Sequence, residues 1–189
     1  MKDRDFYSNI NIPLPNIDWQ TVWGDSSPIG ETTPRWKPII DLNNIWPTEI
    51  HEKFKSIGLR LSMARVFKWH SRPFFPWHID GNEKGTTKCA LNWVVQGIGV
   101  IQWNDSMILD GHTNGLATAA AAGRFNDPYT CQTLPHEKQY LVDTSVPHRV
   151  VVGEEMKDRI TVSILFRDNW LWPYYRTRDK LASVGLIAE

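Results

Sequence analysis

The chain has little cysteine and no excess of charge of either sign. Its 189 residues include two cysteines, Cys89 and Cys131, so we expect no disulfide framework and a reducing, cytoplasmic setting. Lysine plus arginine and aspartate plus glutamate each number 21. This balance disfavours a general nucleic-acid binder, which carries a basic excess. No apolar run approaches the ~18 residues of a membrane-spanning helix, and no secretory signal is visible, so we expect no membrane partner.

Tryptophan, proline and glycine are plentiful instead. The chain has ten tryptophans, twelve prolines and twelve glycines. Large rigid side chains joined by many turns favour a β-rich fold with a lined cavity. No internal repeat and no low-complexity linker divides the sequence, which predicts a single domain.

Hydrophobic periodicity divides this domain into segments. Residues 1–58 are predicted to form an irregular arm, anchored by tryptophans, followed by a helix over residues 46–57. Residues 59–168 are predicted to form the barrel core. The expected strands cover residues 59–69, 88–96, 100–103, 139–142, 149–152 and 159–166. Residues 104–135 are rich in turn signals and predict an insertion that acts as a lid.

A His-x-Asp triplet carries the strongest chemical signal. On a strand, His78 and Asp80 point to the same face and supply two of the three ligands of a facial metal triad. The third ligand should be a histidine from another strand. His148 fits best among the six histidines, because it follows Pro147 at the head of a strand. His51 falls on the predicted helix and His112 in the predicted insertion.

A second polar pattern lies close downstream. Arg159, Thr161 and Ser163 share one face of a predicted strand. We expect residues 148–152 and 159–163 to form a hairpin with His148 opposite Ser163, which sets Arg159 about 13 Å along the sheet from His148. A five-carbon diacid chelated to the metal fills about that gap. Its far carboxylate can be held by the guanidinium, with a hydroxyl donor from Thr161 or Ser163.

The full pattern resembles the Fe(II)- and 2-oxoglutarate-dependent dioxygenases. It comprises His-x-Asp at residues 78–80, a distant histidine, and an arginine about ten residues later with Ser/Thr two positions on. The residues HIDG at 78–81, followed by KCALNW at 88–93, are similar to small microbial and phage members. The resemblance implies a double-stranded β-helix, which is a jelly-roll barrel. It assigns the iron to His78, Asp80 and His148. It assigns the binding of 2-oxoglutarate to Arg159, with help from Thr161 or Ser163, and to Asn92.

The same resemblance implies an activity. Such enzymes use O₂ to oxidise a substrate and release succinate and CO₂. The halogenating branch has a small residue in place of the carboxylate, so Asp80 favours hydroxylation. No block marks a particular substrate, so peptide side chains, free amino acids, nucleotides and small metabolites all stay open, as does the oligomeric state. The basic stretch Arg65, Lys68 and Arg72 can hold an anionic substrate or form a solvated strand face.

Two other functions compete with this interpretation. A cupin-like jelly roll that binds a metal or ligand without catalysis would keep the barrel. Cupins usually offer more histidines and a glutamate, whereas this chain offers Asp80 and the remote Arg159. A zinc hydrolase uses similar ligands but gives no reason for Arg159.

Overall fold

The fold is mainly β. The computed structural model describes residues 5–23, 35–69, 77–80, 88–105, 109–113, 116–119, 129–133, 139–151, 159–167 and 172–188. Sheet A has the strand order β1 (Tyr7–Asn9), β10 (Gln139–Asp143), β5 (Cys89–Gln96), β12 (Arg159–Phe166), β3 (Leu61–Trp69) and β2 (Arg35–Ile39). Sheet B has the order β7 (Leu109–Thr113), β8 (Leu116–Ala119), β4 (His78–Asp80), β11 (His148–Val151), β6 (Gly99–Trp103) and β9 (Tyr129–Thr133).

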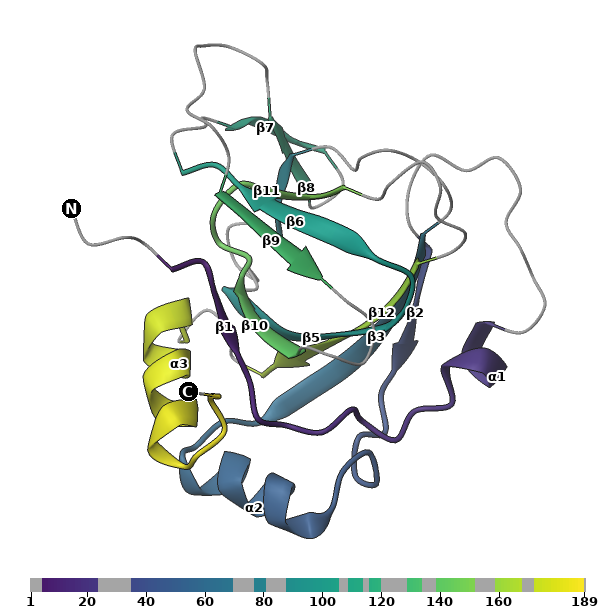
Figure 1. The fold of residues 1–189 in the computed structure, drawn as a ribbon, viewed down its shortest axis with the longest axis vertical. Helices are drawn as coiled ribbons and strands as arrows, with labels where there is room; N and C mark the ends of the chain where they lie inside the picture. Colours follow the sequence, from purple (N-terminus) through teal and green to yellow (C-terminus); the bar gives the residue numbers. More distant parts are fainter. Residues whose placement is uncertain are drawn as a thin grey trace.

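The chain crosses repeatedly between the two sheets. After β3 in sheet A it enters sheet B with β4, returns with β5, and crosses again to β6. The second half repeats this course, from β9 to β10, then to β11 and back to β12. The paired strands are antiparallel throughout. This strand order is that of a double-stranded β-helix, so the predicted jelly-roll barrel is confirmed (Figure 1).

Both faces of sheet A are covered, for different reasons. Strand β12 is buried along its whole length. Its residues Ile160, Val162 and Ile164 join the larger hydrophobic core, which also contains Phe54 of α2 (Thr48–Ser56) and Leu181 of α3 (Tyr174–Ser183). Figure 1 shows α2 and α3 on the side of sheet A that faces away from sheet B. The alternate residues of β12 therefore face the space between the sheets.

The N-terminal segment is more regular than expected. Strand β1 pairs with β10, and β2 pairs with β3, so both are edge strands of sheet A rather than parts of an irregular arm. A short helix, α1 (Trp19–Trp23), lies between them in the chain. Trp23 is buried in the larger core, but Trp36 on β2 is 46% exposed and does not anchor the segment as expected. Backbone hydrogen bonding to the sheet fixes this part of the chain.

The predicted helix over residues 46–57 is confirmed as α2. It begins directly after Pro47, which has no N–H to offer, and the chain turns at Gly58 with φ +75°. Phe54 is fully buried against the barrel, as the apolar spacing indicates.

Two sequence-based expectations differ from the structure. The prediction that residues 148–152 and 159–163 form a hairpin is wrong. Strand β11 pairs with β4 and β6 in sheet B, whereas β12 pairs with β3 and β5 in sheet A. Ser163 therefore lies opposite Arg65 and Asn92, not opposite His148. Within residues 104–135, β7, β8 and β9 are strands of sheet B rather than loop; movement of this segment as a lid stays a prediction.

No helix among the described residues is both long and apolar enough to cross a membrane.

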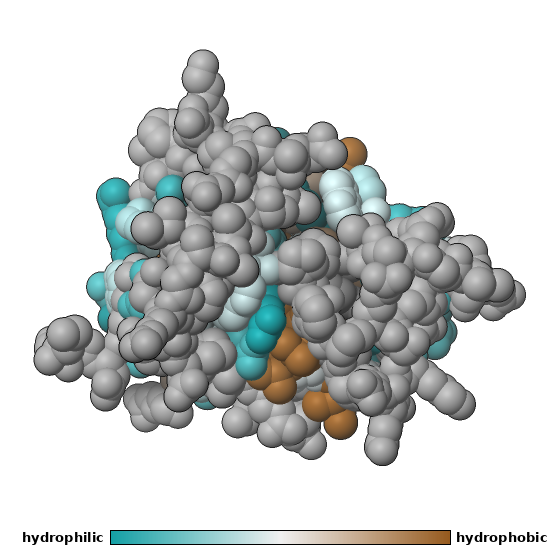
Figure 2. All heavy atoms as spheres, turned by 90° about the horizontal axis from the view of Figure 1, so that it is seen from above, coloured by the Kyte–Doolittle hydropathy of each residue, from teal (hydrophilic) through white to brown (hydrophobic). Residues whose placement is uncertain are grey.

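Figure 2 shows the molecule from above. Near the centre of this view, described hydrophobic residues lie directly beside hydrophilic ones.

Candidate metal centre

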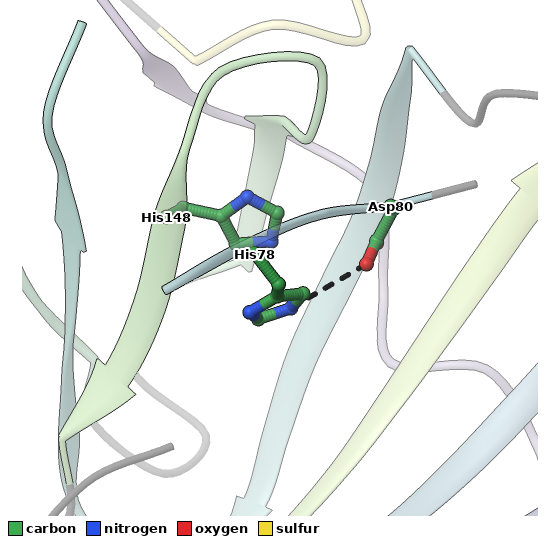
Figure 3. A group of neighbouring side chains, drawn as sticks. All are labelled: His78, Asp80 and His148. Atoms are coloured by element: carbon green, nitrogen blue, oxygen red, sulfur yellow. Dashed lines mark ion pairs between the residues drawn. The ribbon is translucent and has the colours of Figure 1, made fainter. Parts of the chain in front are cut away.

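Two adjacent strands of sheet B bring two imidazoles and a carboxylate together. His78 on β4 is the register partner of His148 on β11. Asp80 lies two residues after His78 on the same strand, so it shares that face. One ligand atom from each of the three residues lies within 4.8 Å of the others. Figure 3 shows the three side chains turned toward one another, with Asp80 Oδ1 at 3.5 Å from His78 Nε2.

The turn before β11 orients His148. The Nδ1 atom of His148 donates a hydrogen bond to the carbonyl of Val146 at 2.9 Å, which leaves Nε2 as the nitrogen with a lone pair. The turn itself is held by the Asp143 carboxylate, which accepts from the Ser145 backbone N–H at 3.0 Å and its hydroxyl at 2.6 Å. The indole N–H of Trp103 donates to the Asp143 carbonyl at 2.9 Å. The orientation of one candidate ligand thus depends on a tightly bonded turn.

The same turn also holds β4 in place. The backbone N–H of Asp80 donates to the carbonyl of Thr144 at 3.2 Å. On the outer side of sheet B, Arg149 donates to the side chain of Gln102 at 2.7 Å and stacks on Trp77, just before His78, at 4.6 Å. The side chain of Asp80 keeps 27% of its surface exposed. The group of three ligands is therefore fixed by its strands but reachable from outside.

The three residues lie in the wall of a cavity between the sheets. It has a volume of about 330 Å³, at the lower end of the range for small-molecule sites. Sheet A contributes most of its polar wall, namely Arg65, Asn92, Arg159, Thr161 and Ser163. Its apolar wall is made by Trp36, Phe67, Ala90, Ile101, Trp103, Val142, Val150 and Leu165. All seven residues chosen from the sequence thus meet in one cavity.

Arg159 is the most deeply buried charged residue of that wall. Its side chain is among the largest fully buried ones, with 2% exposed, and burial lowers its pKa to about 10. A Cβ atom placed on Gly99 would lie 2.8 Å from Arg159 Nε, so the guanidinium stem passes directly over this glycine of sheet B. Gly99 directly precedes Val100, which is the register partner of Val151. Val151 lies three residues after His148 on β11. Arg159 therefore approaches sheet B about 10 Å from the histidines.

Some polar atoms of the wall, Thr161 Oγ1 and Asn92 Oδ1 among them, have unmet hydrogen-bonding capacity. Within the described part of the chain, Thr161 Oγ1 and Asn92 Oδ1 are buried and have no hydrogen-bond partner. A buried polar group without a partner is costly, by about 1–3 kcal/mol, which indicates a polar ligand for these atoms. Asn92 and Ser163 are neighbours across β5 and β12.

The sequence left two interpretations of Arg65 open, contact with an anionic substrate or a solvated strand face, and it predicted Trp36 only as an anchor of the N-terminal arm. Arg65 lies on the cavity face of β3, opposite Ser163, and its guanidinium stacks on Trp36 at 4.7 Å. Burial lowers the Arg65 pKa, and the negative charge of Asp80 opposes that shift. The alternation of Arg65 with buried Ala64 and Val66 could have indicated an inward face, but only the pairing of β3 with β12 shows it. Lys68 points to the opposite face of β3, and Arg72 lies outside the described residues.

Comparisons with known proteins give structural neighbours but no family. The chain matches no protein-family model and no curated protein. Among solved structures it is similar to hydroquinone 1,2-dioxygenase PnpCD, with 12% identity, 55% of this chain covered and a TM-score of 0.37. The chain covers 58% of that dioxygenase chain. A cupin superfamily protein from Desulfitobacterium hafniense shares 10% identity over 71% of this chain and 80% of its own, with a TM-score of 0.36. Hazelnut (Corylus avellana) vicilin shares 9% identity over 72% of this chain and 30% of its own, with a TM-score of 0.40.

Proposed function

We propose that this protein is an Fe(II)- and 2-oxoglutarate-dependent dioxygenase that hydroxylates a small molecule. One observation carries the proposal: a single cavity contains both a His-Asp-His group and a fully buried arginine on the opposite sheet. A metal site alone would explain His78, Asp80 and His148. It would not explain why Arg159 is buried in the wall of the same cavity.

The donor set suits a ferrous ion. Two imidazole nitrogens and one carboxylate oxygen form the facial set that non-haem iron oxygenases use, with positions left open for other ligands. The hydrogen bond from His148 Nδ1 to the carbonyl of Val146 presents the other ring nitrogen to the ion. Asp80 supplies the negative charge, which a purely histidine site would lack.

The opposite wall suits a dicarboxylate. Arg159 can hold the far carboxylate with a bidentate pair of hydrogen bonds, and the carboxylate would in turn compensate the buried positive charge. Thr161 Oγ1 is buried beside it and has no hydrogen-bond partner among the described residues, so it is available as a donor. Ser163 lies two residues after Thr161 on β12, and Ser163 and its register partner Asn92 line the same cavity.

The cavity walls also determine where the reaction occurs. The chemistry supplied by bound iron and 2-oxoglutarate is the activation of O₂, with oxidation of a substrate C–H bond and release of succinate and CO₂. The protein binds and orients the reactants and excludes water. Ile101, Trp103 and Val150 of sheet B, and Leu165 of sheet A, form the apolar lining that keeps the cavity dry.

An anaerobic titration tests this function. Fe(II) and then 2-oxoglutarate are added to the metal-free protein, and the weak visible charge-transfer band of the chelated keto acid is recorded. We expect the band at one equivalent of each in the wild type and its loss in His148→Ala. The matched control is His51→Ala, which removes a histidine of α2 outside this cavity. Conversion of 2-oxoglutarate to succinate in air is the second readout.

Binding of iron without the band and without succinate formation contradicts the proposal. That result would favour a cupin-like jelly roll that binds a metal or ligand without turning over a cosubstrate. Absence of iron binding in the wild type would contradict the metal assignment itself.

A further inference from the structure

The cavity wall contains a second arginine, Arg65, to which the proposed function assigns neither iron nor 2-oxoglutarate. Arg65 lies on β3, opposite Ser163 of β12. Arg159 precedes Ser163 by four residues on β12, which is about 13 Å along the strand. The two guanidinium-bearing positions are therefore at different ends of the cavity. Asp80, one of the three candidate metal ligands, is the charge that acts on Arg65.

The Arg65 guanidinium is held by stacking, and one of its nitrogens has unmet hydrogen-bonding capacity among the described residues. It stacks on Trp36 at 4.7 Å, which limits its rotation. Its Nε is buried and has no hydrogen-bond partner within the described part of the chain. Arginine has five N–H donors in a planar fork that matches a carboxylate. A stacked guanidinium whose buried Nε has no partner among the described residues is suited to an anionic ligand in the cavity.

The charges of the cavity wall also favour an anionic ligand. Its described wall carries two cations, Arg65 and Arg159, and one carboxylate, Asp80. Adding a divalent metal ion and a dianionic cosubstrate leaves one positive charge uncompensated when the histidines are neutral. An unpaired charge in a dry cavity is costly, so a third ligand with one negative charge would be favoured.

We propose that Arg65, backed by Trp36, binds the carboxylate of the substrate, so that the enzyme acts on a small apolar monocarboxylate. This inference rests on the proposed function for the identity of the site, although the anion site itself does not require catalysis. Phe67 and the other apolar residues of the wall contact the body of the substrate. The carboxylate end is held on the side of the cavity where Asp80 lies, which brings the rest of the substrate beside the metal position.

Paired probes separate charge from shape. Acetate, isobutyrate, phenylacetate and indole-3-acetate, each with its uncharged amide, are titrated calorimetrically into the full chain under anaerobic conditions. One series uses protein with Fe(II) alone and the other uses protein with Fe(II) and saturating 2-oxoglutarate. We expect at least one carboxylate to bind ~10-fold or more tightly than its amide in both series. We expect Arg65→Gln to reduce that preference to about 2-fold or less, and Arg65→Lys to restore part of it.

The matched control is Arg176→Gln. Arg176 of α3 also stacks on a tryptophan, at 4.8 Å from Trp172, but it does not line the cavity. This variant should keep the carboxylate preference. Arg65→Gln should also leave the affinities for Fe(II) and 2-oxoglutarate within about 2-fold of the wild type, because the inference assigns Arg65 to neither ligand.

Four other results would overturn the inference, and a fifth would separate it from the proposed function. If no carboxylate binds more tightly than its amide, or if the preference survives in Arg65→Gln, Arg65 binds no carboxylate. If Arg65→Gln weakens Fe(II) binding, Arg65 positions Asp80; if it weakens 2-oxoglutarate binding, it holds the cosubstrate. If the protein binds phenyl phosphate more tightly than phenylacetate, and this preference depends on Arg65, the ligand of Arg65 is a phosphate rather than a carboxylate. An Arg65-dependent preference in the Fe(II)-only series without any keto-acid band would retain the anion site while contradicting the dioxygenase function.

Discussion

His78 lies directly opposite His148 across β4 and β11, with ring centroids 4.3 Å apart. This one register position assembles the candidate metal centre, because Asp80 follows two residues after His78 and shares its face. A slip of one residue would turn His78 and Asp80 to the outer face of sheet B. The turn from Asp143 to Pro147, which delivers His148 and bonds to Asp80, is the part of the chain that prevents this slip.

Replacing the carboxylate ligand should remove iron binding. In Asp80→Ala we expect the Fe(II) affinity to fall by more than ~10-fold, because even partners of metal ligands contribute 10–100-fold. Anaerobic competition with a chelating dye measures the affinity, and thermal unfolding checks that the variant folds. An affinity equal to the wild type, or full turnover at stoichiometric iron, would remove Asp80 from the site.

Loss of the turn should weaken the metal site indirectly. Asp143→Ala removes the acceptor of two hydrogen bonds from Ser145, which should cost about 1–3 kcal/mol of unfolding free energy. We also expect about a 10-fold loss of Fe(II) affinity, since His148 is no longer held. Denaturant unfolding and metal titration measure the two effects.

The control for Asp143→Ala is Asp18→Ala. Asp18 accepts hydrogen bonds from Thr21 at the start of α1, away from the cavity, so the Fe(II) affinity of this variant should be unchanged. A loss of stability in Asp143→Ala with unaltered iron affinity would show that the turn does not orient His148.

Arg159 should make the protein sensitive to 2-oxoglutarate. A ligand present at 100 times its Kd stabilises the folded state by about 2.7 kcal/mol, which for a domain of this size raises Tm by roughly 5–10 °C. We expect this shift in the iron-loaded wild type and none in Arg159→Gln at the same concentration. Thermal unfolding with and without 2-oxoglutarate measures it, with Fe(II) binding as the internal control. An equal shift in both proteins would exclude Arg159 from cosubstrate binding.

Gly99 should matter only through Arg159. A Cβ atom at this position would lie 2.8 Å from Arg159 Nε and 3.2 Å from the carbonyl oxygen of Val151, so Gly99→Ala must displace the guanidinium stem. We expect the 2-oxoglutarate affinity of Gly99→Ala to fall by about 10-fold or more while Fe(II) affinity is kept. The keto-acid band provides the titration signal. A wild-type cosubstrate affinity would show that the position of Arg159 over Gly99 is not required.

Cys89 should be unreactive until the protein unfolds. Burial raises the pKa of its thiol to about 12, and the thiol lies at 3.4 Å from the Thr177 hydroxyl. The pKa is about 8.5 in the unfolded chain, so the stability that the neutral thiol contributes is present below that pH and decreases as pH rises toward 12. In a Cys131→Ser background, iodoacetamide should label Cys89 only in denaturant, as mass spectrometry can show. Rapid labelling of the folded protein at pH 8 would contradict the burial.

Local patterns in the sequence predicted α2, six strands of the barrel and the faces of the candidate residues, but not the strands β1, β2, β7, β8 and β9. Alternation along 159–166 correctly separated Arg159, Thr161 and Ser163 from the residues of the opposite face, because side chains of a strand alternate whatever it pairs with. The spacing of His78 and Asp80 predicted their common face for the same reason. Pro47 and the apolar spacing up to Ile57 predicted α2 within two residues at its start and one at its end.

The tertiary structure decided which strands are neighbours. Two adjacent strands in the chain, β11 and β12, look like a hairpin by sequence, yet they cross between the sheets, because each buries its apolar residues against a different partner. That crossing places Arg159 across the cavity from His148 rather than along one sheet. It also places Arg65 beside Ser163 and Trp36, which no local pattern indicates, since strand pairing depends on contacts between residues far apart in the chain. The candidate site residues could therefore be chosen from the sequence, whereas the arrangement of Arg65 and Arg159 around one cavity follows only from the packing of the two sheets.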